Sequence, residues 1–147
     1  MRLTDEPPET LIGRRVGSLG FAVYAAEGLV QRIGEDAPLS DWPWIGLDAR
    51  AGGQWLEDWL GQHAPGARVV VRIDENALLR REAIRAGMGV HFLPTYEGDA
   101  LPELRRLGPV HFRVGLWLLS HPELRRSRRV RAFTRHMAEA LKVLDEG

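Results

Sequence analysis

The most constraining feature of the sequence is a strand–helix–strand pattern in its middle. Residues 68–73 are rich in β-branched side chains and predict a strand. Asp74 or Glu75 then begins a predicted helix over residues 75–86, because acidic side chains suit the positive end of the helix dipole. Residues 89–94 form the next predicted strand. The short connection predicts a parallel βαβ unit and an α/β fold.

The rest of the chain alternates between strands and helices in the same way. Two glycines, Gly17 and Gly20, predict a turn or bulge between the first two strands. Gly34 and Gly87 each follow a predicted helix and are expected to end it. Further strands are predicted at 11–16, 20–25, 44–48, 104–107 and 111–120, and further helices at 27–33 and 54–63. One more helix is predicted near the C-terminus from the apolar stripe Val130, Phe133, Met137, Leu141 and Leu144.

Composition excludes several classes of protein. The chain has 147 residues, 44% of them apolar, enough for one domain or two small lobes. It contains no cysteine, which excludes disulfides and thiolate metal sites and favours a cytoplasmic location. The five histidines show no metal-ligand spacing, and we find no phosphate or dinucleotide loop, so neither a metal nor a cofactor is expected. No segment approaches the roughly 20 consecutive apolar residues of a membrane span.

Charge is balanced overall but uneven along the chain. Lys and Arg number 20, as do Asp and Glu, so no global attraction to nucleic acid or to anionic membranes is expected. Residues 104–136 nevertheless hold nine arginines and a single acid, Glu123. No recognition motif or interleaved aromatic accompanies these arginines, so we interpret them mainly as the solvated face of the last helix.

Catalytic signatures are weak. Asp74 and Glu75 could act as an acid and a base in a small α/β enzyme, but helix capping explains both residues without chemistry. His91 lies in an apolar strand and is expected to be structural. The residues therefore favour a binding module over an enzyme.

The central segment also resembles a known family. Residues 72–94, ending in AGMGVHFLP, resemble the effector-binding domain of LysR-type transcriptional regulators, in which a helix ending in a similar pattern leads into a crossover strand. Residues 2–8, 21–25 and 116–125 also resemble that domain, and the order of the matching segments holds over all 147 residues. The resemblance implies a small-molecule effector-binding regulatory domain.

The resemblance further implies a type 2 periplasmic-binding-protein-like fold, with two α/β lobes joined by two crossover strands. Residues 26–88 would form a complete lobe, and residues 1–19 and 95–147 an incomplete second lobe. Residues 20–25 and 89–94 would be the crossovers. The helix-turn-helix domain and the opening part of the first lobe have no counterpart in residues 1–147. The resemblance therefore implies an N-terminally truncated regulator that does not bind DNA directly on its own.

An effector would bind between the lobes at the carboxyl ends of the strands. Asp74 and Glu75 would repel an anion there, so the effector is neutral or cationic, or Asn76 alone faces the cleft. The predicted site comprises Asn76, Thr95 and Tyr96 as effector contacts, Asp74 as the residue that orients the helix end, and Leu47 and Asp48 as the opposite wall.

Other interpretations remain open. The chain could be a dimerisation or interaction module without a ligand, since its last helix carries an apolar stripe that must be covered. Its expected macromolecular partner is a second copy of itself or an intact regulator. A small α/β enzyme using Asp74 and Glu75 is the third alternative.

Overall fold

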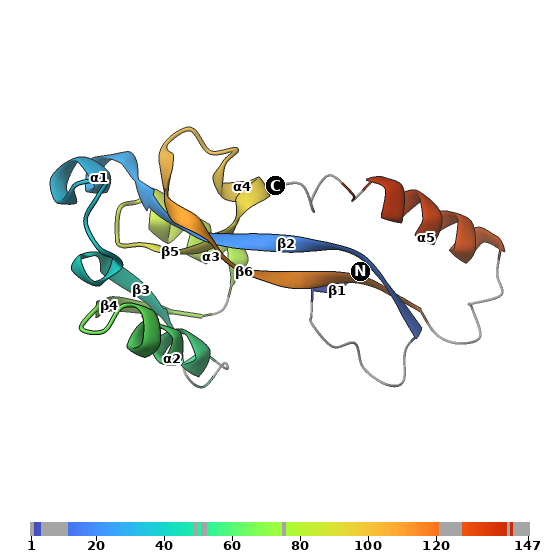
Figure 1. Cartoon of the computed structure of the whole chain (residues 1–147), viewed down its shortest axis with the longest axis horizontal. Coiled ribbons are helices and arrows are strands. Elements are labelled where there is room, and N and C mark those ends of the chain that lie inside the picture. Colours follow the sequence, from blue (N-terminus) through green and yellow to red (C-terminus); the bar gives the residue numbers. More distant parts are fainter. Residues whose placement is uncertain are drawn as a thin grey trace. The chain divides into compact units, whose positions relative to one another are not determined.

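The protein is described here from a computed structural model, which describes residues 2–3, 12–48, 50, 53–74, 76–120, 128–140 and 142 (Figure 1). The chain forms two compact units. We call residues 22–93 and 97–109 the main unit, and residues 1–21, 94–96 and 110–147 the terminal unit. The lobe boundaries expected from the sequence stay a prediction, and residues 97–109 belong with the main unit.

A parallel strand pair forms the centre of the main unit. Strand β3 (Pro43–Leu47) pairs with β4 (Arg68–Ile73), and helix α2 (Gln54–His63) connects them. The predicted strand at 68–73 and helix at 54–63 are confirmed, as is the α/β class. The parallel βαβ unit is therefore β3–α2–β4.

The βαβ unit that the sequence predicted over residues 68–94 is wrong in its pairing. The following strand, β5 (His91–Pro94), belongs to a second sheet and does not pair with β4. Its preceding residue, Val90, bridges in parallel to Trp44 of β3 instead. β3 thus lies between the other two strands, because β4 and Val90 occupy its two edges. The sequence pattern predicted the helix and the strands but not which strands are neighbours in the sheet.

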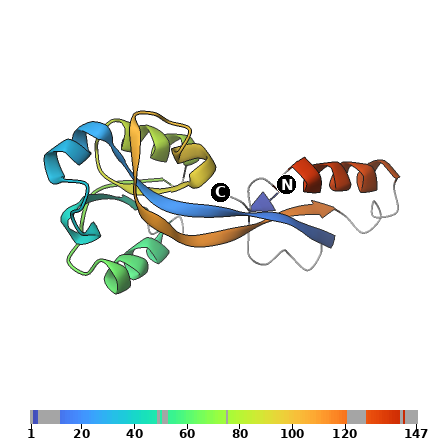
Figure 2. The ribbon, with the colours of Figure 1, turned by 45° about the horizontal axis from the view of Figure 1, so that its top comes forward.

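Helices α2 and α3 (Ala77–Arg85) cover opposite faces of β3. Trp44 packs against Trp59 of α2, with ring centroids 6.1 Å apart. The next residue, Ile45, lies in a buried cluster with Ala83 and Ile84 of α3. Because successive strand side chains point to opposite faces, the two helices lie on opposite sides of the sheet, as Figure 2 also shows.

Helix α3 begins later than the sequence predicted. It spans Ala77–Arg85 rather than 75–86, and its N-cap is Asn76, whose side chain accepts hydrogen bonds from two backbone amides of the first turn. An Asn oxygen reaches those amides directly, which explains why it takes the cap position ahead of the preceding acids. Gly87 ends the helix with a φ of +76°, as predicted.

Two long strands replace four short predicted ones. β2 spans Ile12–Ala26 without the expected turn at residues 17–20, and β6 spans Leu104–Ser120. Gly20 is not in the left-handed region; a Cβ there would lie 3.2 Å from the Val110 side chain. The glycine therefore serves close strand packing rather than a turn. Gly108 does adopt a positive φ, of +86°, inside the continuous β6 strand.

The second sheet has the strand order β1-β6-β2-β5, where β1 is Arg2–Leu3 and pairs antiparallel with β6. The remaining elements are short. Helix α1 (Glu27–Ile33) ends at Gly34 as predicted, and a 3-10 turn covers Leu39–Asp41. Helix α4 spans Thr95–Gly98.

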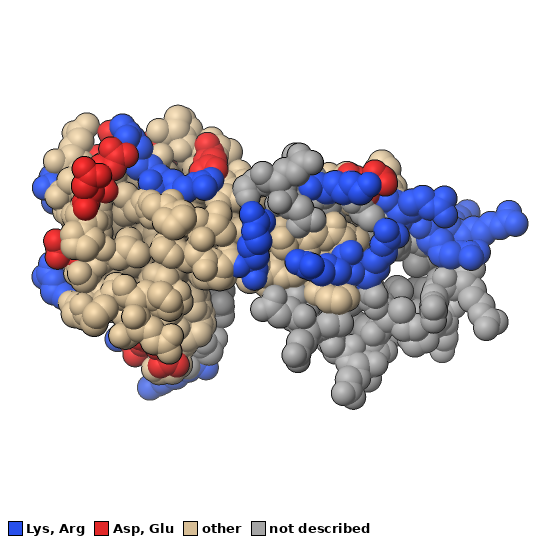
Figure 3. Space-filling model, in the orientation of Figure 1, with Lys and Arg blue, Asp and Glu red and all other residues tan. Residues whose placement is uncertain are grey.

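Helix α5 (Arg128–Ala140) is the predicted C-terminal helix. Phe133, in the middle of its apolar stripe, is 57% exposed. Leu141 and Leu144 lie outside the described residues, as does the side chain of Val130. Basic side chains gather over this part of the molecule in Figure 3. Among the described residues, no helix is long and apolar enough to cross a membrane.

Candidate functional site

The first part of the candidate site is the N-terminus of α3. The Oδ1 atom of Asn76 accepts hydrogen bonds from the backbone amides of Leu78 and Leu79, at 3.0 and 3.1 Å. Its own backbone amide donates to the carbonyl of Asp74, at 2.7 Å. The acceptor end of this side chain is therefore committed to the helix, and its exposed NH2 group is left as a hydrogen-bond donor.

The carboxyl ends of β3 and β4 are tied together at the same edge. The backbone amide of Asp48 donates to the carbonyl of Ile73, at 2.9 Å, and the Asp48 carbonyl accepts from Gly53, at 3.1 Å. A Cβ at Gly53 would lie 2.8 Å from the Asp48 carbonyl oxygen, so only glycine allows α2 to begin this close to β3. The edge thus brings Asp48 near the loop that holds Asp74 and Asn76.

The connections that leave β3 and β4 at this edge diverge. The segments that leave β3 and β4 lead into α2 and α3, which cover opposite faces of the sheet. In open α/β sheets, ligands bind where neighbouring connections diverge in this way, beyond the carboxyl ends of the strands. We call this pair of strand ends the crevice on the strength of that rule, and both ends belong to the main unit.

The six predicted site residues occupy different settings. Asp74 and Asn76 are exposed at the β4 edge, and Asp48 is half-buried, with its Oδ1 accepting from the Arg50 amide at 2.9 Å. Leu47 is only 1% exposed, so its side chain belongs to the core rather than to an open wall.

Thr95 is buried and Tyr96 is 57% exposed. Both lie at the start of α4 and belong to the terminal unit, so their part in the site stays a prediction. Glu75, the second residue of the alternative catalytic pair, lies outside the described residues.

One polar residue near the crevice, His91, was expected from the sequence to be structural. His91 is fully buried, and its Nδ1 atom lies 2.9 Å from the carbonyl oxygen of Ile45. No described group bonds its Nε2 atom. Burial, and to a smaller extent the positive charge of Arg80, lower the pKa of His91 to about 3. The ring is therefore neutral at neutral pH.

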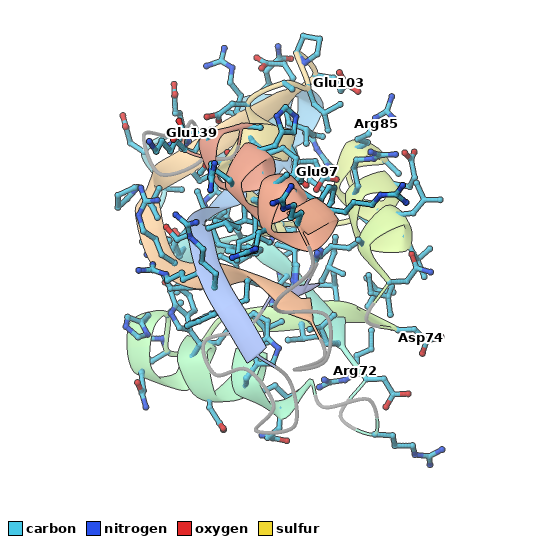
Figure 4. All side chains as sticks on the ribbon, turned by 90° about the vertical axis from the view of Figure 1, so that its right-hand side faces the viewer. Arg72, Asp74, Arg85, Glu97, Glu103 and Glu139 are labelled. Atoms are coloured by element: carbon cyan, nitrogen blue, oxygen red, sulfur yellow. The ribbon has the colours of Figure 1, made fainter. Side chains whose placement is uncertain are left out.

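Ion pairs connect α3 to α4 and to the segment that follows α4. Arg81 lies 3.7 Å from Glu97, and one turn later the Nε atom of Arg85 lies 2.6 Å from Glu103 (Figure 4). These contacts lie in the main unit and hold the helix whose N-terminus lines the crevice.

A second polar cluster anchors the same segment to β2. The buried Tyr24 hydroxyl donates to Oδ1 of Asp99 at 2.7 Å, and Arg106 donates to both oxygens of that carboxylate. Burial alone would raise the pKa of Asp99, but the hydrogen bonds from Arg106 and Tyr24 outweigh it and hold the pKa below its usual value. Burial and the Asp99 hydrogen bond raise the pKa of Tyr24.

A separate groove of about 410 Å³ lies between α2 and β4. Small residues and the Glu57–Arg72 ion pair line it, and none of the six predicted site residues does. We place the candidate site at the strand ends, because hydrogen-bonding groups converge there. Within the described ranges, no three metal-binding side chains are grouped.

Comparisons with known proteins agree with this architecture. A family model described as LysR substrate binding domain matches residues 1–142. The regulatory domain of CrgA, a LysR-type transcriptional regulator from Neisseria meningitidis, is 18% identical with a TM-score of 0.72, over 95% of this chain and 74% of that chain. The effector domain of the regulator AmpR of Pseudomonas aeruginosa is 20% identical with a TM-score of 0.69, over 95% and 68%.

The regulatory domain of CcmR from Synechocystis PCC6803, solved in complex with 2-PG, is 18% identical with a TM-score of 0.67, over 94% of this chain and 71% of that one. No curated protein matches the chain. At these identities the structural matches establish the fold, which is that of type 2 periplasmic binding proteins.

Proposed function

This chain belongs to the LysR substrate-binding domain family, and we propose that it binds a small-molecule effector at the carboxyl ends of β3 and β4. Its family is a regulatory domain of transcription regulators, and such a domain converts the concentration of a ligand into a change of conformation. The proposal concerns where this chain binds its ligand and through which residues.

The observation that carries the proposal is the arrangement around Asn76. Its oxygen caps α3 by accepting from the first-turn amides of Leu78 and Leu79, while its NH2 group stays available as a donor. Asp48 and Asp74 supply acceptors at the neighbouring strand ends. The effector contacts expected of Thr95 and Tyr96, which belong to the terminal unit, remain a separate prediction from the sequence.

The proposal extends to partners and location. We propose that the chain self-associates or associates with an intact regulator, because Val70 on β4 and Leu78 and Leu79 on α3 are large apolar residues left 49%, 59% and 46% exposed. We further propose a cytoplasmic location, no direct DNA binding by residues 1–147, and a regulatory rather than catalytic role.

Amide NMR spectroscopy with a panel of small molecules tests the proposed site. The panel contains amino acids, amino alcohols, polyols and carboxylic acids. We expect at least one compound to shift the amide resonances of Leu78 and Leu79. Shifts confined to other surfaces would overturn the proposal.

Two variants separate binding from folding. Asn76→Asp keeps a good N-cap but removes the NH2 donor, so it should weaken ligand binding with little change in stability. Asn76→Ala should cost about 1 kcal/mol of stability as well. Equal ligand affinity in the wild type and in Asn76→Asp would show that the Asn76 amide is not a contact.

A further inference from the structure

His91 occupies the fork where β5 separates from β3. The backbone amide of Val90 donates to Pro43 at 2.8 Å, and the Val90 carbonyl accepts from Ile45 at 3.0 Å, which is regular parallel pairing. One residue later the backbone turns into the other sheet, and the imidazole of His91 takes over the bond to the Ile45 carbonyl. The ring therefore lies two residues before the carboxyl end of β3.

The hydrogen bond to Ile45 determines what the other ring nitrogen can do. A carbonyl oxygen only accepts, so Nδ1 must carry the proton. A neutral imidazole has one protonated nitrogen, and burial keeps this ring neutral. The Nε2 atom is consequently a bare acceptor, and none of the described groups donates to it. A buried acceptor without a donor costs free energy, so a group that supplies one is favoured there.

The surroundings of His91 connect it to the crevice. Trp55, in the first turn of α2, meets the imidazole edge-on with ring centroids 6.4 Å apart, and its side chain is 36% exposed. The same turn follows Gly53, which packs on Leu47 and Asp48 at the end of β3. Because His91 is fully buried, a ligand reaches Nε2 only when a neighbouring side chain moves, and the partly exposed Trp55 is the neighbour that would have to do so.

We infer that the Nε2 atom of His91 accepts a hydrogen bond from the bound effector, which makes the effector a molecule bearing a hydroxyl or amine group. This inference rests on the proposed function. Asp48 and Asp74 favour such a molecule, because their carboxylates attract donors and repel anions. The positive charge of Arg80, which acts on the His91 ring, disfavours a cation there, so the group that meets Nε2 is an uncharged donor. An effector that offered only a carboxylate would meet three acceptors and leave Nε2 unpaired.

Nitrogen NMR of the histidine side chains tests the inference on the unmodified protein. The probes are ethanolamine, 1,2-propanediol and propionate, which are similar in size. We expect an Nδ1-protonated tautomer for His91, and an Nε2 resonance that shifts with ethanolamine and propanediol but not with propionate. A protonated Nε2, or an equal response to propionate, would overturn the inference.

The two proposals can fail separately. If the donor-bearing probes shift the Leu78 amide and leave Nε2 unchanged, His91 does not contact the effector while the proposed site stands. If no compound of the panel shifts either resonance, the proposed function itself is wrong.

Substitutions give a second test with any compound of the panel that binds. His91→Phe keeps a ring but removes the acceptor, and should weaken binding about tenfold. His91→Gln retains a side-chain acceptor and should restore part of the affinity. The matched control is His63→Phe, since His63 is exposed and its Nδ1 also lies near a backbone carbonyl, that of Trp59 at 3.0 Å. Unchanged affinity in a folded His91→Phe protein would overturn the inference.

Discussion

Helices α3 and α5 look alike in the sequence but are held differently. In both helices the apolar residues form one stripe, and charged residues cover much of the remaining surface. In the main unit, α3 buries Ala83 and Ile84, is capped by Asn76 and is fixed by two ion pairs. In the terminal unit, α5 is longer, yet Phe133 is 57% exposed. The periodicity of apolar residues therefore predicts a helix and its apolar face, but the rest of the fold decides whether that face is covered.

The buried residues follow the same division. The largest fully buried side chains, among them Trp42, Trp44 and Tyr24, all belong to the main unit. In the described part of the terminal unit, the buried residues lie mainly on β2 and β6, for example Leu19, Phe21 and Leu116. Stability measurements should therefore respond far more to changes in the main unit.

The largest expected effect is the difference in stability cost between two aromatic substitutions, one in each unit. Trp44→Ala should cost about 3–5 kcal/mol of unfolding free energy, because it removes a fully buried indole that packs against Trp59 and Phe92. Phe133→Ala should cost less than about 0.5 kcal/mol. Urea unfolding measures both. A cost above about 2 kcal/mol for Phe133→Ala would show that α5 is packed against a partner, either within the chain or in a second copy.

The next largest effect is the pH dependence of the stability of the main unit. The pKa of His91 in the folded protein is about 3, well below its usual value of about 6.5. Below pH 6.5 the unfolded chain binds a proton that the folded chain does not, so stability is present above that pH and is lost as the pH falls. At pH 4.5 the loss should be about 2–3 kcal/mol.

His91→Gln should remove this loss, and the exposed His63→Gln should leave it in place. Urea midpoints at pH 7.5 and pH 4.5 give the comparison. Parallel pH profiles for the wild type and His91→Gln would contradict a neutral, buried imidazole at this position.

A smaller effect is expected where α4 meets β2 in the main unit. A Cβ at Gly98 would overlap the ring of Tyr24, which cannot retreat because its hydroxyl is bound to Asp99. Gly98→Ala should therefore cost about 1–3 kcal/mol. Gly61→Ala is the matched control, since a Cβ there meets nothing within 4 Å inside α2, and it should stabilise the protein by up to about 1 kcal/mol. Equal melting temperatures for the two variants would show that the Tyr24 contact is loose.

Much of this architecture was predictable from local sequence signals. Residues 54–63 and 68–73 have regularly spaced apolar or β-branched residues and end at clear helix or strand boundaries. They form the predicted helix and strand. The four strands predicted within β2 and β6 were wrong in number, because glycines such as Gly20 can serve strand packing as well as turns. Nothing local distinguishes these two uses, since the neighbour Val110 comes from a distant segment.

The candidate site shows the same limit. The position of Asp74, Asn76 and Asp48 at one edge of the sheet was predictable because they follow parallel strands, and their contact with an effector stays a prediction. Leu47 was placed on a wall but lies in the core, since its exposure depends on how α2 begins at Gly53. The unpaired nitrogen of His91 could not be predicted, because it follows from the fork between β3 and β5.

The smallest expected effect separates the two helices by their ion pairs. Arg85 of α3 reaches Glu103, 18 positions along the chain, whereas Lys142 beside α5 pairs at 3.0 Å with Glu139, three residues away. Both pairs are exposed, so a double-mutant cycle on Arg85 and Glu103 should give a coupling of about 0.2–1 kcal/mol that falls at high salt. A cycle on Lys142 and Glu139 should leave the melting temperature unchanged, because the contact joins two exposed side chains only three positions apart. A larger coupling in the second cycle would mean that α5 is part of the cooperative unfolding unit, and that the contrast between the two helices does not hold.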